Sequence, residues 1–352
     1  MAHLTGHFPD EITTEAELED LLSAPESATV DLFRRIEGDV MILGAGGKMG
    51  PTLARMARRA ALQAGKGQDV IAVSRFSESS GERETLEQAG VRTIACDLGD
   101  IDAVRPLPAA RNIIYMAGRK FGERGSEPLT WLMNAVVPAN VAQTFRDSRI
   151  VVYSTGCVYP LVAPQSGGCS ESVPPAPAGE YAASCLGRER IFQYYSSLHG
   201  APALILRLNY AVELRYGVLA DIARTVAAGA PIDLTVSSVN VIWQGDANNR
   251  ALRCLELASS PPAALNITGL ETLSIYDLAV GFGRLMGKVV TFRGQPGAAC
   301  YLSDSRRSME LFGAPRVSVT QIMPWIAKWI ASGGRNLDKP THFSVTDGQF
   351  LD

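Results

Sequence analysis

Short apolar runs alternate with longer amphipathic stretches from residue 39 onward, and this alternation predicts the fold. The apolar runs that predict buried strands cover residues 40–43, 70–74, 91–95, 112–117, 149–154, 203–208 and 264–267. The stretches with helical spacing of apolar residues are 52–63, 82–89, 129–146 and 181–198. Strands separated by helices in this way are typical of a parallel sheet covered by helices on both faces. The pattern therefore predicts an α/β fold with a doubly wound parallel sheet.

Two short amphipathic patterns precede the first strand and predict an N-terminal helical extension over residues 1–38. Thr14 and Glu17 have the spacing of a capping box just before Leu18, where the first apolar face begins. The second pattern follows Ser27. We expect the two helices to pack either on the main body of the protein or on another subunit, and both alternatives remain open.

Three glycines, Gly44, Gly47 and Gly50, follow the first strand and lead into a helix, with Lys48 and Met49 inside the turn. Glycine lets a backbone approach a ligand closely, and the start of a helix offers free N–H groups and the positive end of the helix dipole. A strand, a glycine turn and a helix start therefore form a cradle for phosphate, as dinucleotide binding requires. The alternative is a plain turn between a strand and a helix.

The residues that end the next strands bear on which dinucleotide is bound. Ser74 and Arg75 stand where an acidic side chain would hydrogen-bond the adenosine ribose and repel a 2′-phosphate. A hydroxyl and a guanidinium at this place predict a preference for NADP(H) over NAD(H), with a solvated loop arginine as the alternative for Arg75. The further cofactor contacts expected at the ends of the third and fourth strands are Asp97, Leu98, Ala117 and Gly118.

Two hydroxyl groups and a tyrosine come next along the chain. The fifth strand delivers Ser154 and Thr155 to the same carboxyl edge of the sheet as the glycine turn. A loop rich in proline, glycine and serine covers residues 160–180, and we expect it to be a mobile cover. The helix that follows carries Tyr181 in its first turn and Cys185 one turn later.

The glycine spacing of Gly44, Gly47 and Gly50, the Ser-Thr-Gly-Cys-Val-Tyr strand end at 154–159 and the helix with Tyr181 resemble the extended short-chain dehydrogenases/reductases. This is the group of NAD(P)-dependent sugar-nucleotide epimerases and dehydratases. The resemblance implies a Rossmann-type fold with a smaller C-terminal α/β substrate lobe and a nicotinamide dinucleotide as cofactor. It also implies hydride transfer on a nucleotide sugar or a related hydroxylated substrate, and a homodimer.

The resemblance divides the chain into parts. After the extension of residues 1–38, residues 39–208 are expected to form the dinucleotide-binding domain. Residues 209–332 would form mainly the substrate lobe, from which residues 240 to 267 return to the central sheet. Residues 333–352 show little periodicity and are expected to be a tail.

The positions that match the family's motifs imply the roles of the site residues. Thr155 matches the catalytic hydroxyl, which would hydrogen-bond the substrate oxygen that is oxidised or reduced, and Tyr181 matches the general acid/base. Asn209 matches a residue that contacts the nucleotide diphosphate of the substrate, and Ser154 is a second expected substrate contact. The nicotinamide would lie between the glycine turn and Tyr181.

The sequence departs from the family four residues after the tyrosine, where Cys185 replaces a lysine. The charge of the lysine lowers the pKa of the phenol and its donors hold the nicotinamide ribose, whereas a neutral thiol supplies neither. Arg188 lies on nearly the same helix face as Tyr181 and is one candidate for compensation, although a surface ion pair is its expected role. A nucleophilic Cys185 is a further hypothesis, but a buried, inert thiol is expected.

Composition and charge exclude several classes of function. The chain has 352 residues, of which 20% are charged, and a net charge of −3, so it offers no broad basic surface for nucleic acid or an anionic membrane. The sequence contains no signal peptide pattern and no apolar run of membrane length. The six cysteines form no C-x-x-C pair, and three of the four histidines lie near the ends of the chain, so no metal site or disulfide framework is expected. We expect a cytoplasmic protein with a small-molecule substrate.

Two alternative functions remain open beside an active epimerase, dehydratase or oxidoreductase of this family. A chain that kept the fold and lost the lysine would be a non-catalytic dinucleotide-binding sensor or assembly protein. The glycine turn by itself also resembles that of dihydrodipicolinate reductases, but those chains lack the Ser-Thr strand end and the tyrosine helix that follows it.

Overall fold

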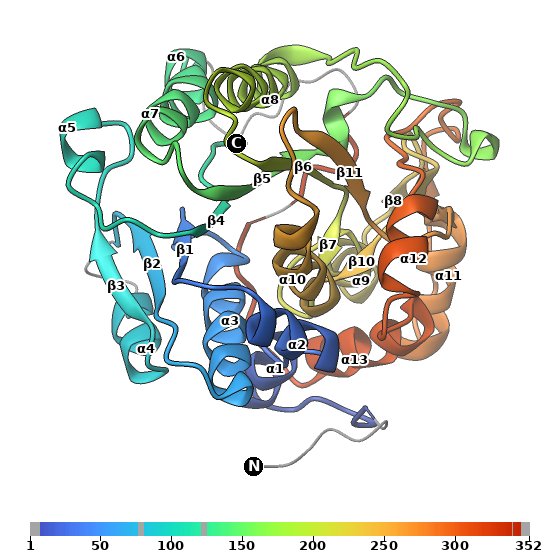
Figure 1. Ribbon diagram of the computed structural model, residues 1–352. Helices are drawn as coiled ribbons and strands as arrows, with labels where there is room; N and C mark the ends of the chain where they lie inside the picture. Colours follow the sequence, from blue (N-terminus) through green and yellow to red (C-terminus); the bar gives the residue numbers. More distant parts are fainter. Residues whose placement is uncertain (1–7, 77–80, 121–124, 340, 346–352) are drawn as a thin grey trace.

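A parallel sheet of seven strands forms the centre of the protein (Figure 1). The computed structural model describes residues 8–76, 81–120, 125–339 and 341–345. The strands are β1 (Val40–Leu43), β2 (Val70–Ser74), β3 (Arg92–Ala95), β4 (Asn112–Tyr115), β5 (Arg149–Thr155), β6 (Ala203–Leu208) and β11 (Ala263–Ile267). Their spatial order is β11-β6-β5-β4-β1-β2-β3, and every neighbouring pair is parallel. The predicted α/β fold with a doubly wound, Rossmann-type sheet is therefore confirmed.

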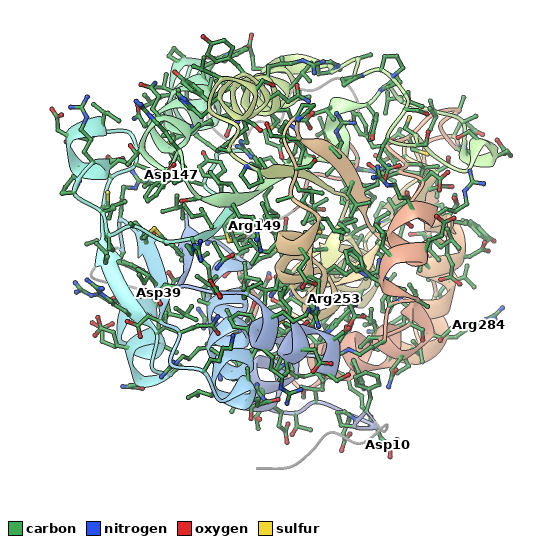
Figure 2. All side chains as sticks on the ribbon, in the orientation of Figure 1. Asp10, Asp39, Asp147, Arg149, Arg253 and Arg284 are labelled. Atoms are coloured by element: carbon green, nitrogen blue, oxygen red, sulfur yellow. The ribbon has the colours of Figure 1, made fainter. Side chains whose placement is uncertain are left out.

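The strand order reverses at β1, which lies between β2 and β4. Leu43 at the end of β1 pairs with Val73 of β2 and with Tyr115 of β4, so the loops that follow these three strands start side by side. Asp39 and Arg149, labelled in Figure 2, stand at the amino ends of β1 and β5 on the opposite edge. Doubly wound sheets bind ligands at the carboxyl edge, where the strand order reverses.

Each face of the sheet is buried under helices. The helices that flank it are α3 (Gly50–Ala64), α4 (Glu82–Gln88), α5 (Ile101–Val104), α7 (Val137–Thr144), α8 (Gly179–His199) and α10 (Gln244–Arg253). Val40 and Ile42 pack with α3 and α10, whereas Met41 and Leu43 pack with α5, α7 and α8 on the other face. Because both faces are buried, the strands are unbroken apolar runs in the sequence.

The helix predicted over residues 129–146 is divided into three parts. α6 (Glu127–Trp131) leads into a π-helical turn (Leu132–Val136), and α7 follows directly. Pro138 in the first turn of α7 has no N–H to donate, and its ring would clash with the carbonyl of Asn134 in a regular α-helix. The wider π-helical turn immediately before it relieves this clash.

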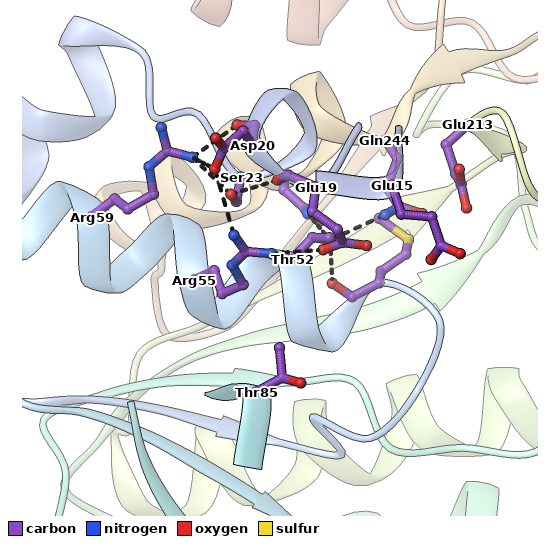
Figure 3. Close-up of polar contacts among 12 residues, drawn as sticks. Glu15, Glu19, Asp20, Ser23, Thr52, Arg55, Arg59, Thr85, Glu213 and Gln244 are labelled. Atoms are coloured by element: carbon purple, nitrogen blue, oxygen red, sulfur yellow. Dashed lines mark hydrogen bonds and ion pairs between the residues drawn. The ribbon is translucent and has the colours of Figure 1, made fainter. Parts of the chain in front are cut away.

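The N-terminal extension packs on the main body of its own chain. Its helices are α1 (Glu15–Leu22) and α2 (Ser27–Arg35). The predicted capping box of Thr14 and Glu17 is present at the start of α1. Figure 3 shows Arg55 of α3 reaching α1, where its guanidinium lies 3.0 Å from a carboxylate oxygen of Glu19. α2 packs against α3, and α1 packs against α10.

A smaller lobe follows β6 and is built around the buried indole rings of Trp243, Trp325 and Trp329. The remaining helices are α9 (Val218–Ala227), α11 (Ile275–Met286), α12 (Arg306–Phe312) and α13 (Val319–Ala331). The short strand pairs are β7 (Ala211–Val212) with β10 (Ile242–Trp243), β8 (Ile232–Asp233) with β13 (Phe292–Arg293), and β9 (Ser238–Val239) with β12 (Leu273–Ser274). The 3-10 turns cover Gly156–Val158, Pro164–Ser166 and Cys254–Leu257.

Three general properties follow from the described residues. No helix among them is long and apolar enough to cross a membrane. No group of three or more histidine, cysteine, aspartate or glutamate side chains there is arranged to hold a metal ion. All six cysteines are buried free thiols.

Candidate active site

The glycine turn at the carboxyl end of β1 has the shape of a phosphate cradle. Gly44 has a φ of 91°, and a Cβ there would lie 2.5 Å from the backbone nitrogen of Ala117 at the end of β4. A Cβ at Gly50 would lie 2.2 Å from the carbonyl oxygen of Ala45, so only glycine lets α3 start against the turn. Gly47 is instead exposed, and a Cβ there would make only an ordinary contact, 3.6 Å from the carbonyl oxygen of Gly44. The space beside the start of α3 fits the pyrophosphate of a dinucleotide.

Lys48 and Met49 complete the turn in different ways. Met49 is the N-cap of α3 and its side chain makes no capping hydrogen bond, which leaves the first amides of the helix for a ligand or water. Lys48 extends toward the smaller lobe, where its Nζ lies 3.5 Å from the ring centroid of Tyr216. Burial raises the pKa of Asp221 in α9, and the charge of Lys48 is among the groups that lower it. A cation therefore joins the glycine turn to the smaller lobe.

The end of β2 meets the same turn. Ser74 Oγ lies 2.5 Å from the position that a Cβ at Gly46 would take, and Arg75 is exposed just beyond it. Glu82 in the first turn of α4 places a carboxylate oxygen 3.6 Å from the same point, and burial raises the pKa of this carboxyl group. Glu82 was not predicted as a site residue, because its place beside Ser74 depends on how α4 packs. The available signal was an acidic residue at the start of the helix that follows β2.

The ends of β3 and β4 present different groups to this edge. Asp97 is exposed, and its Oδ1 accepts a hydrogen bond of 2.9 Å from the backbone N–H of Gly99. Leu98 is buried, and its carbonyl oxygen accepts one of 3.1 Å from Nδ2 of Asn140. Gly118 is exposed at the end of β4. Asp97 and Gly118 thus lie at the surface of the edge, whereas Leu98 belongs to the core.

Thr155 and Tyr181 meet at the carboxyl edge, from the end of β5 and the first turn of α8. Burial raises the pKa of the Tyr181 phenol well above its usual value, and a side-chain hydrogen bond with Thr155 opposes this rise. Cys185 is buried one turn later, and burial raises the pKa of its thiol to about 11. A thiol with this pKa is protonated near neutral pH, which fits an inert Cys185 rather than a nucleophile.

Arg188 is buried, so the surface ion pair expected from the sequence was wrong. Its guanidinium donates hydrogen bonds of 2.8 Å to the carbonyl oxygen of Tyr153 and 2.6 Å to Oδ1 of Asn134, and the residue is 6% exposed. A Cβ at Gly118 would lie 2.2 Å from the same guanidinium, so glycine makes room for it. In the described part of the chain, no carboxylate oxygen lies within 4.0 Å of Arg188, and its buried Nε has no hydrogen-bond partner.

Asn134 and Lys120 also belong to this site, although neither was predicted as a site residue. Asn134 is fully buried and its Nδ2 donates to Ser184 Oγ at 3.0 Å, which links the π-helical turn to α8. Lys120, in the loop after β4, has its Nζ 5.9 Å from the ring centroid of Tyr181 and donates to the carbonyl oxygen of Thr341 at 3.1 Å. Burial lowers the pKa of Lys120. The signal that could have found Lys120 is its place at the carboxyl end of β4, not its spacing from a tyrosine.

Ser154 and Asn209 lie on different sides of Thr155. Ser154 Oγ donates to a carboxylate oxygen of Glu189 at 2.6 Å, and Glu189 forms a buried ion pair with Arg207 at 2.6 Å. Asn209 is buried with its side chain toward the 3-10 turn, where a Cβ at Gly156 would lie 3.1 Å from its Cγ. The structure thus brings the amide of Asn209 next to the turn that follows Thr155, while the hydroxyl of Ser154 belongs to a buried network.

Comparison with protein families matches residues 40–236 to the NAD dependent epimerase/dehydratase family. The match spans more than half of the 352 residues. Comparison with the curated proteins gives no match.

Solved structures of epimerases share the fold. UDP-glucuronic acid 4-epimerase from Bacillus cereus is similar with a TM-score of 0.69 and 17% identity, over 83% of this chain and 98% of that one. A UDP-galactose 4-epimerase gives a TM-score of 0.65 and 20% identity, over 84% and 99% of the two chains. UDP-glucose 4-epimerase from Thermus thermophilus gives 0.66 and 19%, over 82% and 98%. Since the family match covers most of the sheet and these folds agree with it, the protein belongs to the NAD-dependent epimerase/dehydratase family of extended short-chain dehydrogenases/reductases.

Proposed function

We propose that the protein binds a nicotinamide dinucleotide and catalyses an epimerase, dehydratase or reductase reaction on a nucleotide sugar or a related hydroxylated substrate. The observation that carries this proposal is the hydrogen bond between Thr155 and Tyr181 at the sheet edge that also bears the glycine turn. Similar structures give support, because they include MoeE5 in complex with UDP-glucose and NAD and two 4-epimerases in complex with NAD.

The side chains at this edge suit the proton transfers of such a reaction. Oxidation of a secondary alcohol removes a hydride from carbon and a proton from oxygen, and the bound dinucleotide would supply the hydride acceptor. Deprotonated Tyr181 takes the proton, while Thr155 holds the same substrate oxygen by a hydrogen bond. In the reverse direction Tyr181 returns the proton to the oxygen. Asn209, beside the catalytic strand end, is proposed to contact the substrate diphosphate.

Arg188 takes the place of the missing lysine as the source of positive charge in this proposal. Its charge lowers the pKa of Tyr181, which burial raises. A buried cation without a carboxylate partner is costly, and a phenolate beside it offsets part of this cost. Arg188 therefore lowers the pKa of Tyr181, which the neutral thiol of Cys185 does not do.

The alternative is a non-catalytic dinucleotide-binding sensor or assembly protein. Two observations favour it: Cys185 replaces the lysine, and burial raises the pKa of Tyr181 well above its usual value. A site of this kind would bind the cofactor tightly without transferring hydride.

Turnover assays with both cofactors and a panel of nucleotide sugars test these functions, with product formation followed by NMR. Tyr181→Phe is expected to lower kcat by about 10²–10⁴-fold and to retain cofactor binding. Tyr276→Phe is the matched control, because Tyr276 is 50% exposed on α11 in the smaller lobe. Unchanged turnover in Tyr181→Phe would remove Tyr181 from the mechanism.

Cys185→Lys separates the enzyme from its alternative. A large gain in turnover would indicate a site that has decayed from the family pattern. A loss would indicate a site adapted to the thiol and to Arg188. Cofactor binding without turnover in either form would favour the sensor or assembly protein.

The proposal also includes three more specific expectations, on the preferred cofactor, the oligomeric state and the cellular compartment. Exposed Arg75 beside Ser74 supports a preference for NADP(H), whereas the carboxylate of Glu82 at the same place favours NAD(H). Exposed apolar side chains on α6, the π-helical turn and α8 support a homodimer. Six free thiols support a reducing compartment such as the cytoplasm.

A further inference from the structure

The chain turns back toward the candidate site after α13. A Cβ at Gly334 would lie 2.4 Å from atoms of the Trp329 indole, and Trp329 Nε1 donates to the carbonyl oxygen of Arg335 at 3.0 Å. Arg335 also pairs with Glu15 of α1 at 3.3 Å. These contacts fix the base of the returning segment. In Figure 1 the dark red end of the chain runs from α13 toward α8.

The first half of the returning segment contacts the chain between β7 and α9. The N–H of Leu337 donates to the carbonyl oxygen of Arg215 at 3.3 Å. The charges of Lys339 and Arg335 lower the pKa of Glu82, the carboxylate that lies beside Ser74, although burial raises it more. This half of the segment therefore passes close enough to the end of β2 to act on its charges.

The second half crosses the middle of the site. Thr341 is 2% exposed, and its N–H and Oγ1 both donate to Oδ2 of Asp221, at 2.9 and 2.6 Å. The carbonyl oxygen of Thr341 accepts the hydrogen bond from Lys120. Asp221 also interacts with the charge of Lys48 in the glycine turn. Thr341 is thus held between α9 and the loop after β4.

The last described residues reach the catalytic end. Val345 packs on the cluster of Cys157, Ala182 and Tyr301, to which Tyr181 also belongs. Phe343 packs on the apolar core of the smaller lobe. A hollow of about 510 Å³ remains between α9 and this part of the segment.

We propose that residues 335–339 and 341–345 form an autoinhibitory strap that the dinucleotide must displace in order to bind. The strap accepts a hydrogen bond from Lys120 and packs on the cluster around Tyr181, which are two points along the path expected of the cofactor. A cofactor that binds only the open form has its apparent affinity reduced by the fraction of molecules in that form. The proposal rests on the proposed cofactor binding.

Truncation after Gly334 tests the strap, because it removes the segment and keeps the contact of Gly334 with Trp329. We expect the Kd for NAD+ or NADP+, measured by calorimetry, to fall by about tenfold or more if the strap is open in roughly a tenth of the molecules. Hydrogen exchange of the backbone amide of Thr341 in the full chain should become faster when the cofactor saturates the protein, because displacement of the strap breaks its hydrogen bond to Asp221. An unchanged or weaker affinity after truncation, or slower exchange at Thr341 with cofactor, overturns the strap.

A point variant covers the case in which the truncated chain does not fold. Val345→Asp places a charge in the apolar cluster around Tyr181 and should release the strap, with the same gain in affinity. Val289→Asp is the matched control, because Val289 is 88% exposed on the smaller lobe, and its Kd should equal that of the wild type. If no folded form binds either cofactor at millimolar concentration, the cofactor proposal fails and the strap fails with it. A wild type that binds with the same Kd as Val345→Asp rejects the strap alone.

Discussion

Burial raises the pKa of the Tyr181 phenol, Cys185 raises it further, and the charge of Arg188 lowers it. Arg188→Gln removes a buried positive charge, so we expect the pKa of Tyr181, already raised by burial, to rise further. Because the phenolate is the proposed base in the oxidising direction, we expect the rise of kcat/KM with pH to occur at higher pH than in the wild type. The rate at neutral pH should fall by about tenfold for a rise of about one in the pKa.

The pH dependence of kcat/KM is the measurement for Arg188→Gln. Arg190→Gln is its control, because Arg190 is exposed on the same helix and hydrogen-bonds only Gln193 among the described residues. A pH profile that is the same in Arg188→Gln and the wild type would show that Arg188 does not act on the phenol.

Arg75 and Glu82 carry opposite charges beside the place where the adenosine ribose is proposed to bind. Arg75→Ala should weaken NADP+ binding by roughly tenfold and leave NAD+ binding nearly unchanged, because only NADP+ carries a 2′-phosphate for the guanidinium. Glu82→Gln should strengthen NADP+ binding, because it removes a negative charge beside that phosphate. Calorimetric Kd values decide this, and tighter binding of NAD+ than of NADP+ to the wild type would overturn the predicted preference.

At the scale of elements, a buried ion pair ties α8 to the sheet. Arg207 of β6 donates to both carboxylate oxygens of Glu189 in α8, at 3.0 and 2.6 Å. Ser154 of β5 donates to the same carboxylate. Because α8 also carries Tyr181 and Arg188, this network holds these two residues in register with the end of β5.

Glu189→Ala should lower the free energy of unfolding by about 3–5 kcal/mol, because it leaves the charge of Arg207 buried without a partner. Asp31→Ala breaks the exposed ion pair between Asp31 and Arg34, whose side chains are 48% and 56% exposed, respectively. This variant should change the free energy of unfolding by less than about 1 kcal/mol. Urea denaturation measures both. Equal losses in the two variants would contradict the predicted role of the Glu189 network.

At the scale of the whole molecule, one surface carries a band of exposed apolar side chains over neighbouring helices. Trp131, Leu132 and Val136 belong to α6 and the π-helical turn, and Tyr194 and Leu198 belong to α8. α6 and the π-helical turn both pack against α8, so these side chains lie on adjoining elements. Apolar surface of this kind is typical of an interface between subunits.

Leu198→Asp should therefore convert a dimer into a monomer, because a charge at a buried dimer interface is costly. Light scattering after gel filtration gives the mass of each form. Leu270→Asp is the control, since Leu270 is 56% exposed outside this band, and it should leave the dimer intact. A wild type that is monomeric at high concentration would reject the predicted homodimer.

The sequence by itself determined the parts of the protein that depend on near neighbours. The alternation of apolar runs located all seven strands of the sheet, and the spacing of Thr14 and Glu17 located the start of α1. The glycine turn was recognisable because Gly44, Gly47 and Gly50 have fixed places between a strand and a helix. Such features follow from local backbone geometry, so a short window of residues is enough to predict them.

The tertiary structure alone decided which distant residues meet at the site. Arg188 is buried because Gly118, at the end of a different strand, leaves space for its guanidinium. Lys120 and Val345 reach the surroundings of Tyr181 from a loop and from the end of the chain, and neither has a spacing in the sequence that relates it to the tyrosine. The order of the strands and the path of the chain after α13 set these distances, and local periodicity does not encode either of them.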